Sequence, residues 1–77
     1  MILFSNMTIK DLPDYRKEKG LTQQQTADLM GTVQPAVARF EKGLLKGHVT
    51  SFGTLEKYVK ALGLEIRINI YKPEVRF

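Results

Sequence analysis

The sequence predicts a mainly α-helical domain followed by one short β-strand. Apolar residues recur at three- and four-residue steps through residues 12–62, which is the spacing of amphipathic helices. From Leu64 to Tyr71 the period changes to two, because aliphatic and polar residues alternate. Single glycines divide the helical part where helices commonly end, at Gly20, Gly31, Gly43 and Gly63. We therefore expect one domain over residues 1–77, with a helical part at 11–63 and a strand at 64–71.

The composition narrows the class of protein. The 77 residues carry twelve Lys and Arg against eight Asp and Glu, a formal net charge of +4. A domain of this size buries only about 60–65% of its unfolded surface, so association with a second copy would help to stabilise it. With no cysteine and one histidine, neither a disulfide nor a metal centre is expected. No apolar run approaches the ~18 residues of a membrane span, and residues 1–4 are too short for a signal peptide, so we expect a soluble, cytoplasmic protein without cofactors.

The first helix is bounded by a proline and a glycine. Residues 1–10 show no helical period and are predicted to form a short strand or an arm over the core. Pro13 is tolerated only in the first turn of a helix, which makes Asp11 the predicted N-cap. The helix then spans residues 12–19 and ends before Gly20.

The second helix is short and begins at a threonine. Thr22 is predicted to cap a helix over residues 23–30. Ala27 and Met30 form its inward face, and Gly31 ends it.

The third helix is predicted over residues 34–42. Pro35 fits its first turn, and Val37 and Phe40 face inward. Gly43 is expected to end it.

The fourth helix is predicted to begin after an N-cap at Ser51 and to end before Gly63. The expected core-facing stripe of this helix consists of Phe52, Leu55, Val59 and Leu62.

The two tyrosines of the predicted helices, Tyr15 and Tyr58, are interpreted as packing residues rather than platforms on which nucleic-acid bases stack.

The two helices between Gly20 and Gly43 indicate a helix–turn–helix motif. Ala27 is small where the two helices must approach closely, and a glycine lies at the turn. On the second of these helices, Gln34 and Arg39 share a polar face, and their side chains suit the edges of A and G bases in the DNA major groove. The positive net charge also favours a polyanionic partner. The motif therefore predicts sequence-specific binding of double-stranded DNA.

The same segment resembles the phage-repressor and Cro type of helix–turn–helix, the XRE family. The resemblance covers residues 11–63 and implies a bundle of four or five helices whose third helix enters the major groove. It also implies an internal ion pair between Arg16 and Glu41, which would tie the first helix to the third. The residues that carry the resemblance are Arg16, Gly20, Leu21, Thr22, Gln23, Ala27, Gly31, Gln34, Val37, Arg39, Phe40, Glu41, Lys42 and Gly43.

The predicted interface contains two kinds of contact. The resemblance implies that Gln23 touches phosphate and that Gln34 reads a base. The full set predicted to contact bases is Gln34, Pro35, Ala36 and Arg39. The full set predicted to contact phosphate is Thr22, Gln23, Lys42, Lys46 and His48.

Two positions depart from the family pattern. Val33 stands where Ser or Thr usually caps the third helix, so no side-chain cap is expected there. Thr26 stands where a larger aliphatic residue is usual, which is expected to thin the packing of the second helix.

The predicted strand needs a partner for its unpaired backbone groups. The favoured partner is the same strand of a second copy, paired antiparallel about a two-fold axis. This layout resembles antitoxins of the HigA and HipB kinds, in which a short strand follows the helix–turn–helix. A hairpin with residues 2–4 of the same chain is the alternative. The aliphatic residues of the predicted dimer strand are Leu64, Ile66, Ile68 and Ile70.

These observations predict a homodimeric transcriptional repressor of a palindromic operator, and within that class the autoregulating antitoxin of a type II toxin–antitoxin module with a cognate toxin. The alternatives are a free-standing phage or plasmid-type repressor and a restriction–modification controller. From a different class, the fold could serve as a protein-interaction module that does not bind DNA. No carboxylate pair, nucleophile–base set or phosphate loop is recognisable, so no enzyme activity is expected.

Overall fold

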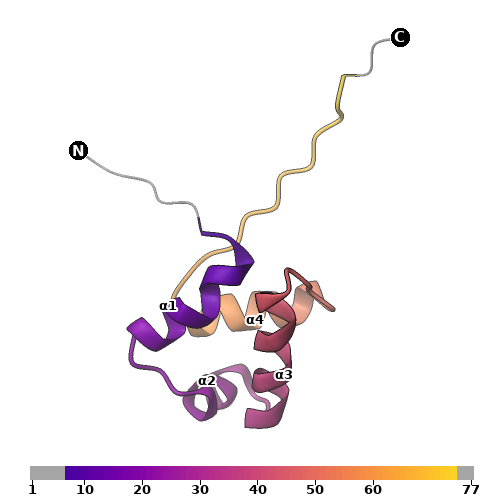
Figure 1. The fold of residues 1–77 in the computed structure, drawn as a ribbon. Coiled ribbons are helices and arrows are strands. Elements are labelled where there is room, and N and C mark those ends of the chain that lie inside the picture. The colour runs from indigo at the N-terminus through magenta and orange to yellow at the C-terminus, as the bar shows by residue number, and fades with distance from the viewer. Residues whose placement is uncertain (1–6, 75–77) are drawn as a thin grey trace, which may run out of the picture.

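The computed structural model describes residues 7–74, and within this range four α-helices follow a single turn of 3-10 helix (Figure 1). The mainly helical prediction is confirmed. Most of the predicted N-terminal strand or arm lies outside the described residues, and the described Ile9 and Lys10 belong to the 3-10 turn. The elements are η1 Ile9–Asp11, α1 Leu12–Glu18, α2 Gln23–Met30, α3 Gln34–Leu45 and α4 Phe52–Ala61.

The helices enclose one apolar core. α2 packs against both α3 and α4, and α1 packs against α3. Ala27 of α2 is completely buried, so its small side chain allows this close packing. The rings of Phe40 and Tyr58 lie with centroids 5.3 Å apart and join α3 to α4, which confirms Tyr58 as a packing residue. The buried apolar residues are Leu12, Ala27, Val37, Phe40, Leu44, Leu55, Tyr58, Val59 and Leu62.

All three predicted N-cap residues directly precede their helices, and two of them make a side-chain cap bond. The side-chain oxygens of Thr22 and Ser51 each accept a hydrogen bond from a backbone N–H three residues further on, at 3.0 and 3.3 Å. Asp11 directly precedes Leu12, the first residue of α1, as predicted, but its side chain accepts no hydrogen bond from α1. The Asp11 carboxylate instead accepts from the backbone N–H and the hydroxyl of Thr8, at 3.0 and 3.1 Å, and so closes η1.

The third helix is longer than predicted. The prediction that Gly43 ends it is wrong, because α3 continues to Leu45. Leu44 is completely buried, and the burial of its side chain outweighs the cost of about 1 kcal/mol for a glycine inside a helix. The chain reverses at Gly47, whose φ of 75° lies in the left-handed region. The N–H of His48 then donates to the Gly43 carbonyl at 2.8 Å, which completes the helix end.

The core-facing stripe of α4 also differs from the prediction in one residue. Leu55, Val59 and Leu62 are buried as expected, but Phe52 is 64% exposed. Phe52 is the first residue of α4, so it lies at the edge of the bundle, beyond the helices that cover the rest of the stripe. Tyr58, which the predicted stripe does not include, is completely buried.

The C-terminal segment does not form the predicted strand within the described residues. Residues 64–74 leave the bundle as an extended chain without helix or paired strand (Figure 1). Leu64 and Ile66 still pack against the core, whereas Ile68 and Ile70 are 59% and 95% exposed. The alternating pattern specifies which side chains share a face, but a strand also requires a paired partner, and no segment within residues 7–74 pairs with this one. The alternative hairpin with residues 2–4 lies outside the described residues.

Candidate nucleic-acid interface

A tight turn fixes the direction in which α3 leaves α2. Gly31 ends α2 with a left-handed φ of 72°, and the next N–H donates back to a carbonyl of α2 at 2.9 Å. Val33 precedes α3 without a side-chain cap, as expected, and is 61% exposed. Thr26 is completely buried, and its hydroxyl donates to the carbonyl of Thr22 at 2.9 Å, so its polar group is satisfied.

The outer face of α3 carries the residues predicted to contact bases. Pro35 and Arg39 are exposed, whereas Gln34 and Ala36 are half-buried. All four lie in the first two turns of α3, and the N-terminal part of the second helix is the part that reaches base edges in helix–turn–helix docking. The opposite face of α3 is buried in the core, so the helix is held in a fixed orientation.

The residues predicted to contact phosphate lie around this face. Lys42, Lys46 and His48 are exposed at the end of α3 and in the loop that follows it. Thr22 is exposed at the start of α2, where its side-chain oxygen accepts the N-cap hydrogen bond. The two lysines provide the positive charge that phosphate groups require.

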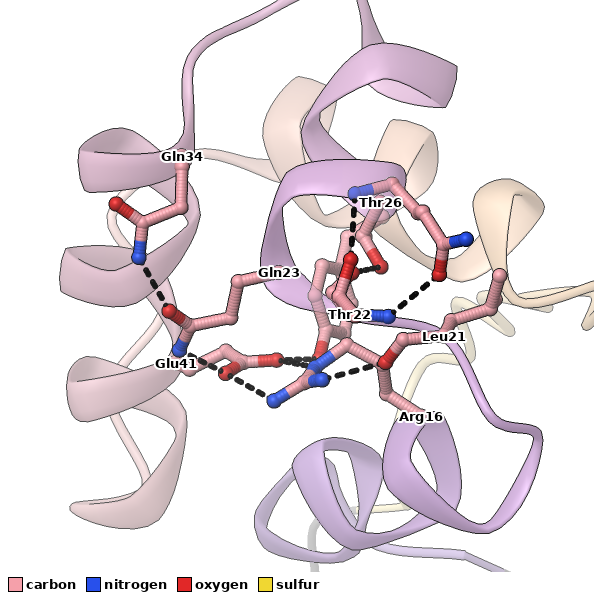
Figure 2. Close-up of polar contacts among 9 residues, drawn as sticks. Arg16, Leu21, Thr22, Gln23, Thr26, Gln34 and Glu41 are labelled. Carbon is pink, nitrogen blue, oxygen red and sulfur yellow. Dashed lines mark hydrogen bonds and ion pairs between the residues drawn. The ribbon is translucent and has the colours of Figure 1, made fainter.

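Beneath this face lies a buried ion pair between Arg16 of α1 and Glu41 of α3 (Figure 2). Arg16 Nε and Nη2 donate to Glu41 Oε2 and Oε1 at 2.5 and 3.1 Å, so the pair is bidentate. Arg16 Nη1 donates further to the carbonyl of Leu21 at 2.6 Å. The two residues are only 5% and 4% exposed. The pair is therefore structural, and it joins α1 to α3.

Glu41 accepts from two further side chains. Tyr58 Oη donates to Glu41 Oε2 at 2.5 Å, and Gln23 Nε2 donates to Glu41 Oε1 at 2.9 Å. Burial alone would raise the pKa of the Glu41 carboxyl, but the hydrogen bonds from Arg16, Tyr58 and Gln23 outweigh burial and hold this pKa below its usual range. Burial and the adjacent carboxylate together raise the pKa of Tyr58 above its usual range. Glu41 is therefore an anion and Tyr58 a neutral donor.

The network reaches the outer face of α3 through two glutamines. Gln34 Nε2 donates to Gln23 Oε1 at 2.6 Å, and Gln23 in turn donates to Glu41 (Figure 2). The Gln23 amide thus lies between α2 and α3, and its contact with phosphate stays a prediction. The sequence does not predict the hydrogen bonds that join Gln23 to Gln34 and Glu41, nor the hydrogen bond from Tyr58 to Glu41. From the sequence, Tyr58 is interpreted only as a packing residue, and no sequence signal indicates which polar groups meet across two helices.

Other kinds of site find little support in the part of the chain that the structure describes. No group of three or more His, Asp or Glu side chains in residues 7–74 could hold a metal ion. No helix in the same range is long and apolar enough to cross a membrane.

Comparison with known proteins bears on the helix–turn–helix itself. A family model described as Helix-turn-helix, of the XRE type, matches residues 14–69, which is more than half of the chain. The matched range begins within α1 and contains the whole of α2, α3 and α4. No curated protein and no solved structure gives a significant match.

Proposed function

Because the chain belongs to the XRE-type helix-turn-helix family, we propose that it is a transcriptional repressor that binds a specific sequence of double-stranded DNA. The observation that carries this proposal is the outer face of α3, which combines Gln34 and Arg39 in its first two turns. α3 enters the major groove, and these two side chains contact base edges there. The proposal assigns no catalytic reaction to the chain.

The distribution of charge supports DNA as the partner. Arg39, Lys42 and Lys46 are exposed along α3 and at its end. Glu41 lies among them in the sequence, but it is buried and paired with Arg16, so its negative charge is neutralised beneath the surface. The surface of α3 is therefore more basic than its sequence suggests, which favours encounter with a polyanion.

We propose that the repressor acts as a homodimer joined through residues 64–71. In one chain this segment is extended, and Ile68 and Ile70 expose their aliphatic side chains. Antiparallel pairing with the same segment of a second copy would satisfy the backbone groups and cover these side chains. Two copies of α3 spaced roughly 34 Å apart could then enter successive major grooves on one face of a palindromic operator.

The test is selection of binding sites from random DNA, followed by titration at several salt concentrations. Each phosphate neutralised contributes a slope of about −0.9 to log K against log salt, so several contacts per protomer predict roughly −4 to −8 for the dimer. The selected sites should be palindromic. A flat salt response, or equal affinity for selected and random DNA, would contradict the proposal.

Within this class we favour an autoregulating antitoxin of a type II toxin–antitoxin module. The support is the layout of a helix–turn–helix followed by a short apolar C-terminal segment. Co-expression with the product of the adjacent gene tests this role. The adjacent gene product should inhibit growth alone and lose that effect when this chain is present. A neighbour without toxicity would favour a free-standing phage or plasmid-type repressor, or a restriction–modification controller.

A protein-interaction module is the alternative from a different class. It predicts no retention on DNA even at low salt, although the chain would be folded. The exposed basic face of α3 favours DNA binding over this alternative.

A further inference from the structure

A continuous line of hydrogen bonds joins the core of the protein to the outer face of α3. Tyr58 and Arg16 donate to the buried carboxylate of Glu41. The side-chain amide of Gln23 donates to the same carboxylate at 2.9 Å and accepts from Gln34 at 2.6 Å. The side chains in this line come from all four α-helices. Gln34 is the last of them, and Figure 2 shows its bond to Gln23.

The chemistry of Glu41 sets the direction of every bond in this line. An ionised carboxylate can only accept hydrogen bonds, so the Gln23 atom that faces it must be the nitrogen. The Gln23 atom that faces Gln34 must then be the oxygen, and the Gln34 atom that faces Gln23 must be a nitrogen. This order follows from the donors and acceptors themselves and does not depend on telling amide nitrogen from oxygen by position.

Glu41 cannot easily turn its carboxylate to accommodate another arrangement. It is 4% exposed, and both its oxygens accept from Arg16. Tyr58 Oη adds a bond to Oε2, and its ring is fixed by complete burial against Phe40. The anchor of the line is therefore rigid, whereas Gln23 and Gln34 at its outer end are half-buried.

The fixed direction leaves a defined set of groups on Gln34. One N–H is used toward Gln23, so Oε1 and the second N–H remain for DNA. An acceptor beside a donor matches the N6 amino group and N7 of adenine in the major groove. The reverse orientation would turn the oxygen toward Gln23 and present the two N–H groups to the groove, which suits the two acceptors of guanine better.

We propose that Glu41 is a positioning residue for base recognition, which fixes the amide of Gln34 through Gln23 and thereby selects adenine at one base pair. The inference rests on the proposed function, because Gln34 must face a base for its orientation to matter. Glu41 itself does not contact DNA.

The first test compares two glutamines on α2. Gln23→Met removes the middle of the line and leaves Arg16 and Glu41 paired. Gln24→Met is the matched control, because Gln24 is exposed and its amide donates only to Asp28, at 2.9 Å. Each protein is titrated with operators that carry each of the four base pairs at every position.

The wild-type protein and Gln24→Met should prefer adenine at one position in each half-site by about tenfold or more. Gln23→Met should reduce this preference to about twofold, measured as a ratio of affinities so that a uniform loss of binding cancels. If Gln23→Met kept the full preference, the inference would be overturned and the proposed function would stand. If the wild-type protein did not bind DNA, the proposed function itself would fail.

The second test needs no DNA. Gln34→Glu places a pure acceptor against Gln23 Oε1, which should be unfavourable while Glu41 fixes the amide. Glu41→Gln introduces a side chain that can donate or accept, so in the double variant Gln23 is free to turn round and donate to the new carboxylate at position 34. The equilibrium constants for urea unfolding are compared among the wild type, the two single variants and the double variant. The effect of the double substitution should therefore differ from the product of the two single effects by about fivefold or more.

The same cycle in the Gln23→Met background is the control, because it removes the amide but keeps the charges at positions 34 and 41. Coupling should vanish there. Coupling that persisted in the Gln23→Met background would arise from direct charge repulsion between positions 34 and 41 and would overturn the inference. Additivity of the two substitutions in the protein that retains Gln23 would overturn it as well.

Discussion

At the scale of single residues, the proposed DNA interface around α3 contains side chains expected to select a sequence and side chains expected to hold the protein on DNA. Arg39 projects from the first two turns of α3, whereas Lys46 caps its C-terminal end. Contacts to base edges carry sequence information, and contacts to phosphate do not. The two residues are therefore expected to respond differently to the same truncation.

Arg39→Ala should cost about 1–3 kcal/mol of binding and relax the preference at one base pair, because a guanidinium contact with guanine is lost. Lys46→Ala should weaken binding to all sequences alike and make the salt slope shallower by about one. Titration of a set of single-base operator variants at two salt concentrations separates these effects. Unchanged sequence preference in Arg39→Ala would mean that α3 is placed wrongly in the groove.

The stability of the fold is expected to depend on the buried ion pair between Arg16 and Glu41. Arg16→Met replaces the guanidinium-bearing side chain with an unbranched apolar one. It leaves Glu41 as a buried charge without its main partner. Breaking a buried pair from one side typically costs about 3–5 kcal/mol. Urea unfolding at neutral pH measures this change, and a loss below about 0.5 kcal/mol would be the behaviour of an exposed pair.

The same pair predicts how stability depends on pH. The folded protein holds the pKa of Glu41 below its usual range, so the unfolded chain takes up this proton first as the pH falls. The contribution of Glu41 is therefore fully present above the usual carboxyl range and is lost as the pH falls through its lowered pKa. Urea midpoints between pH 7 and pH 3 should fall in the wild type, and this fall should be smaller in Glu41→Gln.

At the scale of elements, the ends of the helices depend on a few local groups. The left-handed turn at Gly47 ends α3 and directs the chain toward α4. Gly53 lies in the first turn of α4, where its φ is not positive and an added Cβ would meet only Ser51 Oγ at 3.6 Å. These two glycines therefore have different structural roles, since Gly47 lies in the loop between α3 and α4 and Gly53 within α4.

Gly47→Ala should lower stability by about 1 kcal/mol or more, because an L side chain is strained at a φ of 75°. Gly53→Ala is the matched control and should raise stability by about 0.5–1 kcal/mol, since alanine suits a helix better than glycine. Thermal unfolding of both variants gives the comparison. Equal and small effects would mean that the turn at Gly47 does not constrain the end of α3.

At the scale of the whole molecule, the proposed binding of a palindromic operator depends on the distance between the two copies of α3 in a dimer. The helical domain ends with Gly63, and the segment after it extends away from the bundle (Figure 1). A dimer joined there could hold both copies of α3 at a fixed separation, which a palindromic operator requires.

Deletion of residues 65–77 should therefore produce monomers and weaken operator binding, while the helices stay folded at lower stability. Ile68→Pro is the milder variant, because it removes one backbone donor from the proposed ladder and leaves the helical domain intact. Sedimentation equilibrium and operator titration of both variants check this. A tight dimer without the segment would refute the proposed interface.

Most of the fold can be predicted from local chemistry. The caps at Thr22 and Ser51 and the turn at Gly31 follow from what single residues allow the backbone to do. The apolar spacing likewise predicts burial of Val37 and Phe40. Such signals extend over only a few residues, so they can be recognised before the chain is folded.

Packing between distant segments decides the rest. Burial of Leu44 carries α3 past Gly43, and the edge of the bundle leaves Phe52 exposed. The contacts of Glu41 with Tyr58 and Gln23 join residues from three helices, and no local pattern encodes them. The strand expected at residues 64–71 is absent from the described chain for the same physical reason: alternation selects a face, but pairing requires another segment beside it.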